Sequence, residues 1–273
     1  MTRRTFAATL AAVSLASAAK LTKGNLGVQV YTVRNILDAN PAKVLTDIHG
    51  IGFTELEATA DTVARAWPAI EASGLKLTSL HLNTAPTDAQ FADAKTKGFT
   101  YAVVPYIPPA QRGGVSVMKK LAASLQDSGK RAQQHGLKFC YHTHAFEYEP
   151  MEGTSPLQIL MGETDPKLVG LELDIFWAQV AGHNPVEVLK TYSGRVPLLH
   201  LKDKAKGLVP DAQFNEKVPK ELFAEVGNGS LDIPAILTAA NSAGVQHYFV
   251  EQDQSPDPLA SLRQSYAYLS KHF

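Results

Sequence analysis

Short apolar runs and amphipathic stretches alternate eight times along this chain, and this alternation constrains the fold more than any other feature. A short apolar run between turn signals predicts a buried strand, and an amphipathic stretch predicts a helix. We expect strands over Leu26–Tyr31, Phe53–Glu57, Leu77–Leu82, Thr100–Val104, Leu137–His142, Leu168–Asp174, Val196–Leu201 and Gln246–Glu251. We expect helices over 41–50, 61–73, 88–97, 115–135, 155–163, 185–192, 231–243 and 257–271.

This rhythm predicts a parallel sheet, because a strand, a helix and the next strand form a right-handed crossover. Eight such units of about 250 residues in all close into a barrel. An open doubly wound sheet is the alternative, but no strand is followed by the glycine-rich sequences that bind nucleotides in such sheets. The expected fold class is α/β, a (β/α)8 TIM barrel formed by residues 19–273 as one domain.

The first 18 residues have the layout of a signal peptide. Arg3 and Arg4 precede an apolar stretch, and the small residues Ala16 and Ala18 suit a cut after position 18. The paired arginines are typical of a twin-arginine signal. We therefore expect a periplasmic or otherwise exported protein without stable membrane insertion once the signal is removed. Because this pathway carries folded proteins, it favours a cofactor that is loaded before export.

Charge and cysteine content exclude several classes of function. The 273 residues contain 26 Lys and Arg against 26 Asp and Glu, so bulk charge argues against nucleic-acid binding. Cys140 is the sole cysteine, which excludes an internal disulfide and a C-x-x-C motif. Any function based on charge must therefore be local.

Polar residues gather where the last four strands end, which is where TIM barrels place their chemistry. The residues are His142, His144 and Glu147 after the fifth strand, Asp174 and Trp177 after the sixth, His200 and Lys202 at the seventh, and Glu251 at the eighth. Burying such charges is costly unless they are paired or bind a cation. The pattern predicts one divalent metal ion, which nitrogen and oxygen ligands would select as manganese, zinc, cobalt or iron. A set of salt bridges at the open end of the barrel is the purely structural explanation.

Four segments resemble the sugar phosphate isomerase/epimerase group of the xylose isomerase-like TIM barrels. They are Tyr-His-Thr-His-Ala-Phe-Glu-Tyr, Leu-Asp-Ile-Phe-Trp, His-Leu-Lys-Asp and the last Val-Glu, and the resemblance covers residues 25–273. It implies one divalent metal bound by Glu, Asp, His and Glu from strands five to eight, with Asp174, His200 and Glu251 as ligands. Many relatives have Glu where this chain has His142. We assign the fourth ligand to Glu147, with His142 as the alternative.

A metal beside histidines and a lysine suits the polarisation of a sugar carbonyl and removal of the neighbouring proton. We expect His142 and His144 to transfer protons, and the resemblance implies that Glu251 also exchanges one. Lys202 either holds a substrate oxygen or forms an ion pair with a neighbouring carboxylate. Isomerases, epimerases and β-eliminating lyases share this first step.

The remaining candidate residues would contact the substrate. Alternation along the strands favours Gln29, Glu57 and His81 as inward-facing partners of sugar hydroxyls. Trp177 could stack on a sugar face. The resemblance adds Glu225, which lies in a loop that often approaches the site in relatives. The long segment 203–230 is the candidate cover of the site.

These expectations combine into a divalent-metal-dependent isomerase, epimerase or carbon–oxygen lyase. Its substrate would be a small carbohydrate, namely a sugar, keto-sugar or cyclitol such as a 3-keto-glycoside or an inosose. A non-catalytic sugar-binding barrel is one alternative, and an AP endonuclease-like phosphodiesterase is a weaker one because the chain is neutral. No nucleic-acid partner is expected, and whether the chain forms a homo-oligomer stays open.

Overall fold

Eight parallel strands close into a barrel in the order β1-β10-β7-β6-β5-β4-β3-β2. The structure is a computed structural model that describes residues 20–209 and 213–273, so the predicted signal peptide lies outside the described part. The strands are β1 (Leu26–Gln29), β2 (Glu55–Thr59), β3 (Lys76–His81), β4 (Tyr101–Val104), β5 (Lys138–His142), β6 (Gly170–Asp174), β7 (Leu198–Leu201) and β10 (His247–Val250). The predicted (β/α)8 barrel is confirmed.

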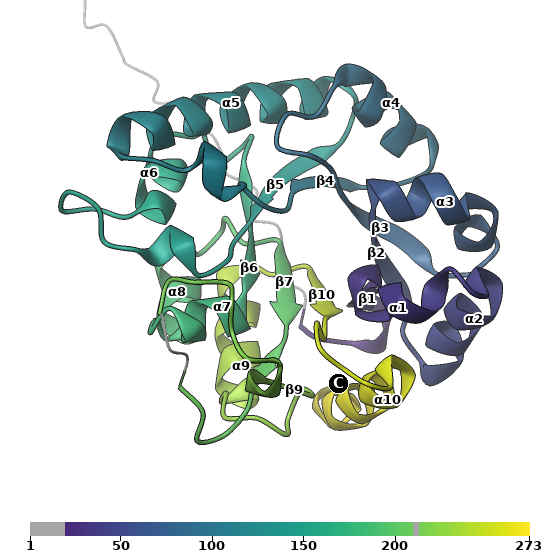
Figure 1. Ribbon diagram of the computed structural model, residues 1–273. Helices are drawn as coiled ribbons and strands as arrows, with labels where there is room; N and C mark the ends of the chain where they lie inside the picture. Colours follow the sequence, from purple (N-terminus) through teal and green to yellow (C-terminus); the bar gives the residue numbers. More distant parts are fainter. Residues whose placement is uncertain (1–19, 210–212) are drawn as a thin grey trace, which may run out of the picture.

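Helices surround the strands on the outside of the barrel (Figure 1). They are α1 (Arg34–Leu37), α2 (Pro41–Ile51), α3 (Ala60–Glu71), α4 (Asp88–Thr96), α5 (Val115–Gln134), α6 (Pro156–Gly162), α7 (Ile175–Val180), α8 (Pro185–Thr191), α9 (Ile233–Ala243) and α10 (Pro258–Leu269). Proline occupies the first turn of α2, α6, α8, α9 and α10, where its missing N–H costs no helical hydrogen bond. These helices cover the outward, apolar face of the strands.

Several short elements near the strand ends, α1 and α7 among them, were not predicted. The expected end of the first strand is instead a 3-10 turn, Val30–Val33, because the Gln29 side chain accepts a hydrogen bond from the Tyr31 backbone N–H at 3.0 Å. Helix α7 begins directly after Asp174, whose Oδ1 accepts from the N–H groups of Phe176 and Trp177. Asp174 therefore caps this helix while it ends strand β6, which fixes its orientation.

The segment after β7 is held by one buried carboxylate. Two short strands, β8 (Asp203–Lys204) and β9 (Phe223–Ala224), pair antiparallel within it. Asp203 accepts hydrogen bonds from the backbone N–H groups of Gly227, Gly229 and Leu231 at 3.0 to 3.1 Å. A Cβ at Gly229 would overlap Asp203 Oδ1, so the turn requires glycine there.

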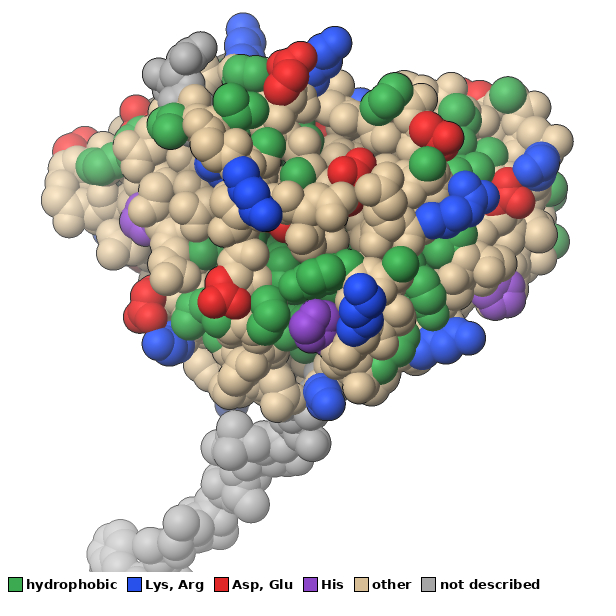
Figure 2. All heavy atoms as spheres, turned by 90° about the horizontal axis from the view of Figure 1, so that it is seen from below, with side chains coloured by type: hydrophobic (Ala, Val, Ile, Leu, Met, Phe, Trp, Pro, Cys, Tyr) green, Lys and Arg blue, Asp and Glu red, His purple; other side chains and the backbone are tan. Residues whose placement is uncertain are grey.

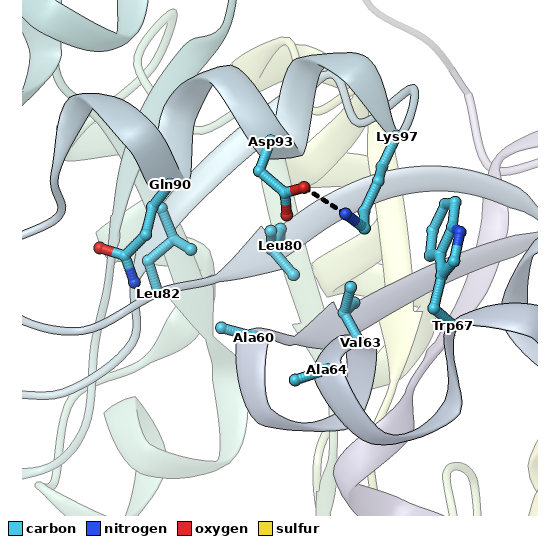
Figure 3. A pocket seen from close by; sticks show the side chains of 9 residues that line it. All are labelled: Ala60, Val63, Ala64, Trp67, Leu80, Leu82, Gln90, Asp93 and Lys97. Carbon is cyan, nitrogen blue, oxygen red and sulfur yellow. Dashed lines mark hydrogen bonds and ion pairs between the residues drawn. The ribbon is translucent and has the colours of Figure 1, made fainter.

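Strand β3 shows how alternation separates the two sides of the barrel wall. Leu80 and Leu82 line a pocket of about 230 Å³ on the outside, between α3 and α4, together with Trp67 (Figure 3). His81 lies between them in sequence and lines the cavity at the open end of the barrel, which Leu82, one residue past the end of the strand, also reaches. Polar side chains are thus directed inward by the same pattern that buries leucine against the helices.

Among the described residues, no helix is both long and apolar enough to cross a bilayer.

Candidate active site

A cavity of about 600 Å³ lies over the carboxyl ends of the strands. The polar and aromatic residues that line it include Gln29, His81, Tyr106, His142, His144, Trp177, Lys202, Glu216, Phe223, Glu251 and Asp253. They come from seven different strand ends or the loops that follow them, although they are far apart in the sequence. This is the place where barrels of this fold carry their active sites.

Three predicted metal ligands come together next to this cavity, and Glu251 is the one that lines it. Ligand atoms of Asp174, His200 and Glu251 all lie within 4.8 Å of one another, and the three side chains are buried. His200 Nδ1 lies 2.9 Å from Glu251 Oε2. Asp174, at the end of β6, lies opposite His200 of the neighbouring strand β7. We call Asp174, His200 and Glu251 the upper group.

Lys202 lies among the carboxylates of this region. Its Nζ is 2.9 Å from Glu251 Oε2, 3.1 Å from Asp174 Oδ2 and 3.1 Å from Asp253 Oδ2. Burial lowers the pKa of Lys202, but the three carboxylates outweigh burial and raise the pKa well above its usual value. Lys202 is therefore an ammonium group that can donate to a substrate oxygen in the cavity. The sequence left two roles open for Lys202, an ion pair with a neighbouring carboxylate and contact with a substrate oxygen. The structure shows the ion pair with Glu251 and also places Lys202 in the wall of the cavity.

His142 lies beside the upper group. Its Nε2 is 4.0 Å from Asp174 Oδ2, and its Nδ1 is 3.0 Å from Glu172 Oε2. Burial, with His200 nearby, lowers the pKa of His142 well below the usual value, so the ring is neutral. A neutral imidazole at this position can coordinate a metal ion.

The structure does not bring Glu147 to the upper group. Its Oε1 accepts from the Tyr141 hydroxyl at 2.5 Å, and its Oε2 accepts from the backbone N–H of His144 at 2.9 Å. Tyr141 packs in the apolar layer of the core, on the opposite side of β5 from His142. Glu147 therefore is not placed as a metal ligand, and the alternative, His142, is the residue of this segment that lies next to Asp174.

Beneath the cavity floor lies a buried network of histidines and glutamates. His81 Nε2 is 2.6 Å from Glu57 Oε2 and 2.8 Å from Glu172 Oε2. His200 Nε2 is 3.0 Å from Glu57 Oε1. Burial lowers the pKa of His81, but Glu57 and Glu172 outweigh it and raise the pKa to about 10. Glu57 is thus brought to the site from below and does not line the cavity where a substrate hydroxyl would lie.

Aromatic side chains form one wall of the cavity. The His144 ring packs against Tyr106 and Trp177, with ring centroids 5.1 Å and 5.5 Å away. Burial and the charge of Lys202 lower the pKa of His144 to about 3, so its ring is neutral. Among the described residues, His144 Nδ1 and Trp177 Nε1 are buried without a hydrogen-bond partner. These two atoms are available to a bound polar molecule.

The other predicted contact residues divide into two kinds. Gln29 lines the cavity and its Nε2 lies 3.3 Å from His81 Nδ1, so it also positions that ring. Glu225 is half-buried in the turn before α9 and is not among the residues that line the cavity. The structure therefore does not bring Glu225 to the site. Glu216 and Phe223 of the same segment 203–230 line the cavity instead.

Three cavity or floor residues were missed from the sequence. Asp253 and Glu172 each lie two positions from a predicted ligand, and strand alternation could have identified Glu172 as a second inward residue of β6. Burial raises the pKa of Asp253 to about 7, against the effect of Lys202. Tyr106 follows the fourth strand, whose end carries no charged residue that would have indicated a site.

The donor set fits a divalent metal ion. Asp174 Oδ2 is fully buried and accepts no hydrogen bond from any described residue, although it has Lys202 as an ion-pair neighbour. Burial raises the pKa of Asp174, although the charges of Lys202 and His200 oppose the shift. Asp174, His200, Glu251 and the adjacent His142 would hold the ion, with the mixed oxygen and nitrogen ligands expected for manganese, zinc, cobalt or iron.

Other surfaces offer less chemistry. The pocket of Figure 3 is lined mainly by aliphatic side chains and Trp67, with an Asp93–Lys97 ion pair at its edge. On the face seen in Figure 2, acidic and basic side chains are interspersed. This mixture agrees with the neutral charge of the sequence.

Comparison with known proteins finds curated relatives that match part of this chain. Inosose dehydratase 2 of Bacillus cereus is 33% identical over 144 residues, which cover 50% of this chain and 48% of that protein. The chain thus spans about half the length of the curated relatives it matches.

Solved structures resemble the chain over a greater length. A sugar phosphate isomerase/epimerase from Parabacteroides distasonis has a TM-score of 0.71 at 23% identity, covering 97% of this chain and 98% of that one. The IOLI protein, determined with a bound zinc atom, has a TM-score of 0.68 at 16% identity, covering 91% and 99%. The sequence pattern of the xylose isomerase-like TIM barrels matches residues 89–272. The chain belongs to the xylose isomerase-like TIM barrel family.

Proposed function

We propose that this protein is a divalent-metal-dependent enzyme that removes a proton next to the carbonyl of a sugar, keto-sugar or cyclitol. The observation that carries the proposal is the upper group, which lies beside a lysine on the floor of a 600 Å³ cavity with aromatic walls. When bound there, the metal ion would supply Lewis-acid polarisation of the substrate carbonyl. Isomerisation, epimerisation and β-elimination all begin with this proton removal.

The residues of the chain take distinct roles in this proposal. Lys202 donates a hydrogen bond to a substrate oxygen, since its pKa keeps it protonated. We assign proton removal to His144, whose ring lines the cavity and whose Nδ1 is buried without a partner among the described residues. Glu251 lines the same cavity and is a carboxylate, because Lys202 and His200 lower its pKa despite burial. It exchanges the proton at the next step.

The walls of the cavity support a carbohydrate substrate. Trp177 and Tyr106 present aromatic faces that suit the apolar face of a sugar ring, and Gln29 adds an amide for a hydroxyl. The relatives of matching sequence include an inosose dehydratase, which supports a cyclitol or keto-sugar with a free carbonyl. We favour the 3-keto-glycoside and inosose classes, in which no phosphate has to be held.

Export through the twin-arginine pathway is part of the proposal and is supported by Arg3, Arg4 and the apolar residues that follow. Fractionation of cells that express the protein tests it. We expect the protein in the periplasmic fraction, and replacement of Arg3 and Arg4 by lysine should retain it in the cytoplasm. Equal distribution of both forms would contradict export.

The chemical proposal is tested by proton exchange. The purified protein, loaded with manganese, zinc or cobalt, is incubated in deuterated water with a panel of ketoses, inososes and 3-keto-glycosides, and substrate deuteration is followed by NMR. We expect exchange at one carbon next to the carbonyl of at least one panel member, and loss of exchange with chelator. Binding without exchange would favour the non-catalytic sugar-binding barrel. Metal-dependent cleavage of abasic DNA would favour a phosphodiesterase.

A further inference from the structure

We propose that the barrel holds a second, deeper divalent metal ion bound by His81, His142, Glu172 and His200, which we call the lower group. Ligand atoms of these four residues all lie within 4.8 Å of one another, and the side chains are buried. The proposal goes beyond the proposed function, which requires a metal ion only at the upper group. Together the two sites would form a centre in which His142 and His200 stand between the two ions.

The three imidazoles of the lower group surround one carboxylate oxygen. Glu172 Oε2 lies 2.8 Å from His81 Nε2, 3.0 Å from His142 Nδ1 and 3.5 Å from His200 Nε2. The other oxygen, Glu172 Oε1, is buried and has no hydrogen-bond partner among the described residues. A carboxylate with one unsatisfied buried oxygen amid three nitrogen donors is an arrangement that a cation would stabilise.

The two rings shared with the upper group have one nitrogen for each site. His200 directs Nδ1 toward Glu251, at 2.9 Å, and Nε2 toward the lower group. His142 directs Nε2 toward Asp174, at 4.0 Å, and Nδ1 toward Glu172, at 3.0 Å. Occupation of the lower site therefore does not use the atoms that face the upper carboxylates. A ring that binds ions through both nitrogens is an imidazolate, and its proton is released to solvent when the second ion binds.

Charge balance supports a cation at this depth. Glu57 and Glu172 are both completely buried, and the lysine of the region, Lys202, pairs with Asp174, Glu251 and Asp253 instead. The two deep carboxylates therefore depend on histidine alone for compensation. Buried carboxylates of this kind are stable only when they are paired or coordinate a metal. In the metal-free protein these histidines balance the carboxylates only as imidazolium cations, and a divalent ion would replace the protons that they then carry.

Three imidazoles and one carboxylate indicate the kind of metal. Nitrogen-rich four-ligand sets of this type suit zinc, cobalt or iron rather than magnesium or calcium, which prefer oxygen. The compact spacing around Glu172 Oε2 would open to metal bonds of about 2 Å by small side-chain movements.

Metal counting tests the lower site. The purified protein is stripped with chelator, reloaded with Zn²⁺, freed of excess ion and analysed by elemental mass spectrometry. We expect two zinc ions per chain in the unaltered protein and one in Glu172→Gln. The matched control is Glu55→Gln, because Glu55 is an equally buried carboxylate that pairs with Lys76 and His247 outside both groups. This control should keep two.

Zinc-edge anomalous diffraction from crystals of the unaltered protein provides a second readout that does not depend on any variant folding. The expected result is a peak within about 2 Å of Glu172 Oε2, in addition to one at the upper group. One zinc per chain, located at Asp174 and Glu251 and kept in Glu172→Gln, would overturn the lower site and leave the proposed function intact. No bound zinc at all would overturn both.

Discussion

Lys202 Nζ lies 2.9 Å from Glu251 Oε2 at the floor of the cavity, and both residues are buried. The pair belongs to a larger contact, since Asp174 and Asp253 each approach the same ammonium group to 3.1 Å. The lysine therefore holds together carboxylates that would otherwise repel one another. It also faces the cavity, so the residue links the stability of the barrel end to the chemistry that we propose there.

Replacing Lys202 by methionine should destabilise the metal-free protein. The change leaves three carboxylates without their ammonium partner, and breaking a buried ion pair in this way costs about 3 kcal/mol. Urea unfolding in the presence of chelator measures the effect. Lys190→Met is the control, because its pair with Glu187 is exposed and should contribute less than about 1 kcal/mol. Equal unfolding free energies for the two variants would show that the Lys202 contacts are not stabilising.

Asp174→Asn should remove the upper metal ion while keeping the fold. The amide oxygen can still cap α7, as Asp174 Oδ1 does for Phe176 and Trp177, but the negative charge facing Lys202 and His200 is lost. We expect kcat/KM to fall at least about 100-fold, since a metal ion contributes several kcal/mol to such reactions. Metal analysis and the deuterium-exchange assay measure this.

Asp165→Asn serves as the matched control for that experiment. Asp165 is exposed and its Oδ1 accepts from the backbone N–H of Lys167, so this aspartate also holds a turn but lies outside the site. Full metal content and activity are expected. If Asp174→Asn retained the metal content of this control, the ligand role of Asp174 would be refuted.

Glu147 should make the stability of the protein depend on pH. Burial raises its pKa from 4.5 to about 8, although the Tyr141 hydroxyl and backbone N–H groups oppose the shift. The native state therefore holds this proton more tightly than the unfolded state. The contribution of Glu147 to the unfolding free energy is lost as the pH rises from about 4.5 through about 8. Relative to Glu147→Gln, the unaltered protein should lose a few kcal/mol across this window.

Urea unfolding of both proteins at about pH 5 and about pH 9, with chelator present, checks the effect of Glu147 on stability. Chelator removes the separate pH dependence of metal binding. The glutamine variant keeps the shape of the side chain and cannot ionise. Parallel pH profiles for the two proteins would mean that the Glu147 carboxyl is already ionised at low pH.

Gly229→Ala should weaken substrate binding through the segment 203–230, here called the covering segment, whose Glu216 and Phe223 line the cavity. The new Cβ would overlap Asp203 Oδ1 and displace the carboxylate that holds the backbone N–H groups of Gly227 and Leu231. Because Phe223 of the same segment lines the cavity, we expect KM to rise more than kcat falls.

The control for this substitution is Gly50→Ala, within α2, where a Cβ meets nothing within 4 Å. It should be neutral or stabilise the protein by up to about 1 kcal/mol. A KM for Gly229→Ala equal to that of this control would remove the covering segment from the site.

Much of the candidate site could be predicted from local sequence. The alternation of eight strands and eight helices determined the barrel, and the barrel determined where the strands end. Asp174, His200 and Glu251 follow from this, because each closes an apolar strand and the ends of parallel strands meet on one side. His81 and Gln29 follow in the same way from the two-residue period of a strand.

Only the tertiary structure placed His142, rather than Glu147, beside Asp174 and brought Glu172 and Asp253 to the candidate site. His142 is inside the barrel because it lies on the inward side of β5, whereas a 3-10 turn directs Glu147 back to Tyr141. Asp253 lies in the loop between β10 and α10. A loop sequence has no periodicity from which its contact with Lys202 could be predicted. The physical reason is one of range: strand faces are determined by neighbouring residues, whereas loop directions and contacts across the barrel are determined by the packing of the whole fold.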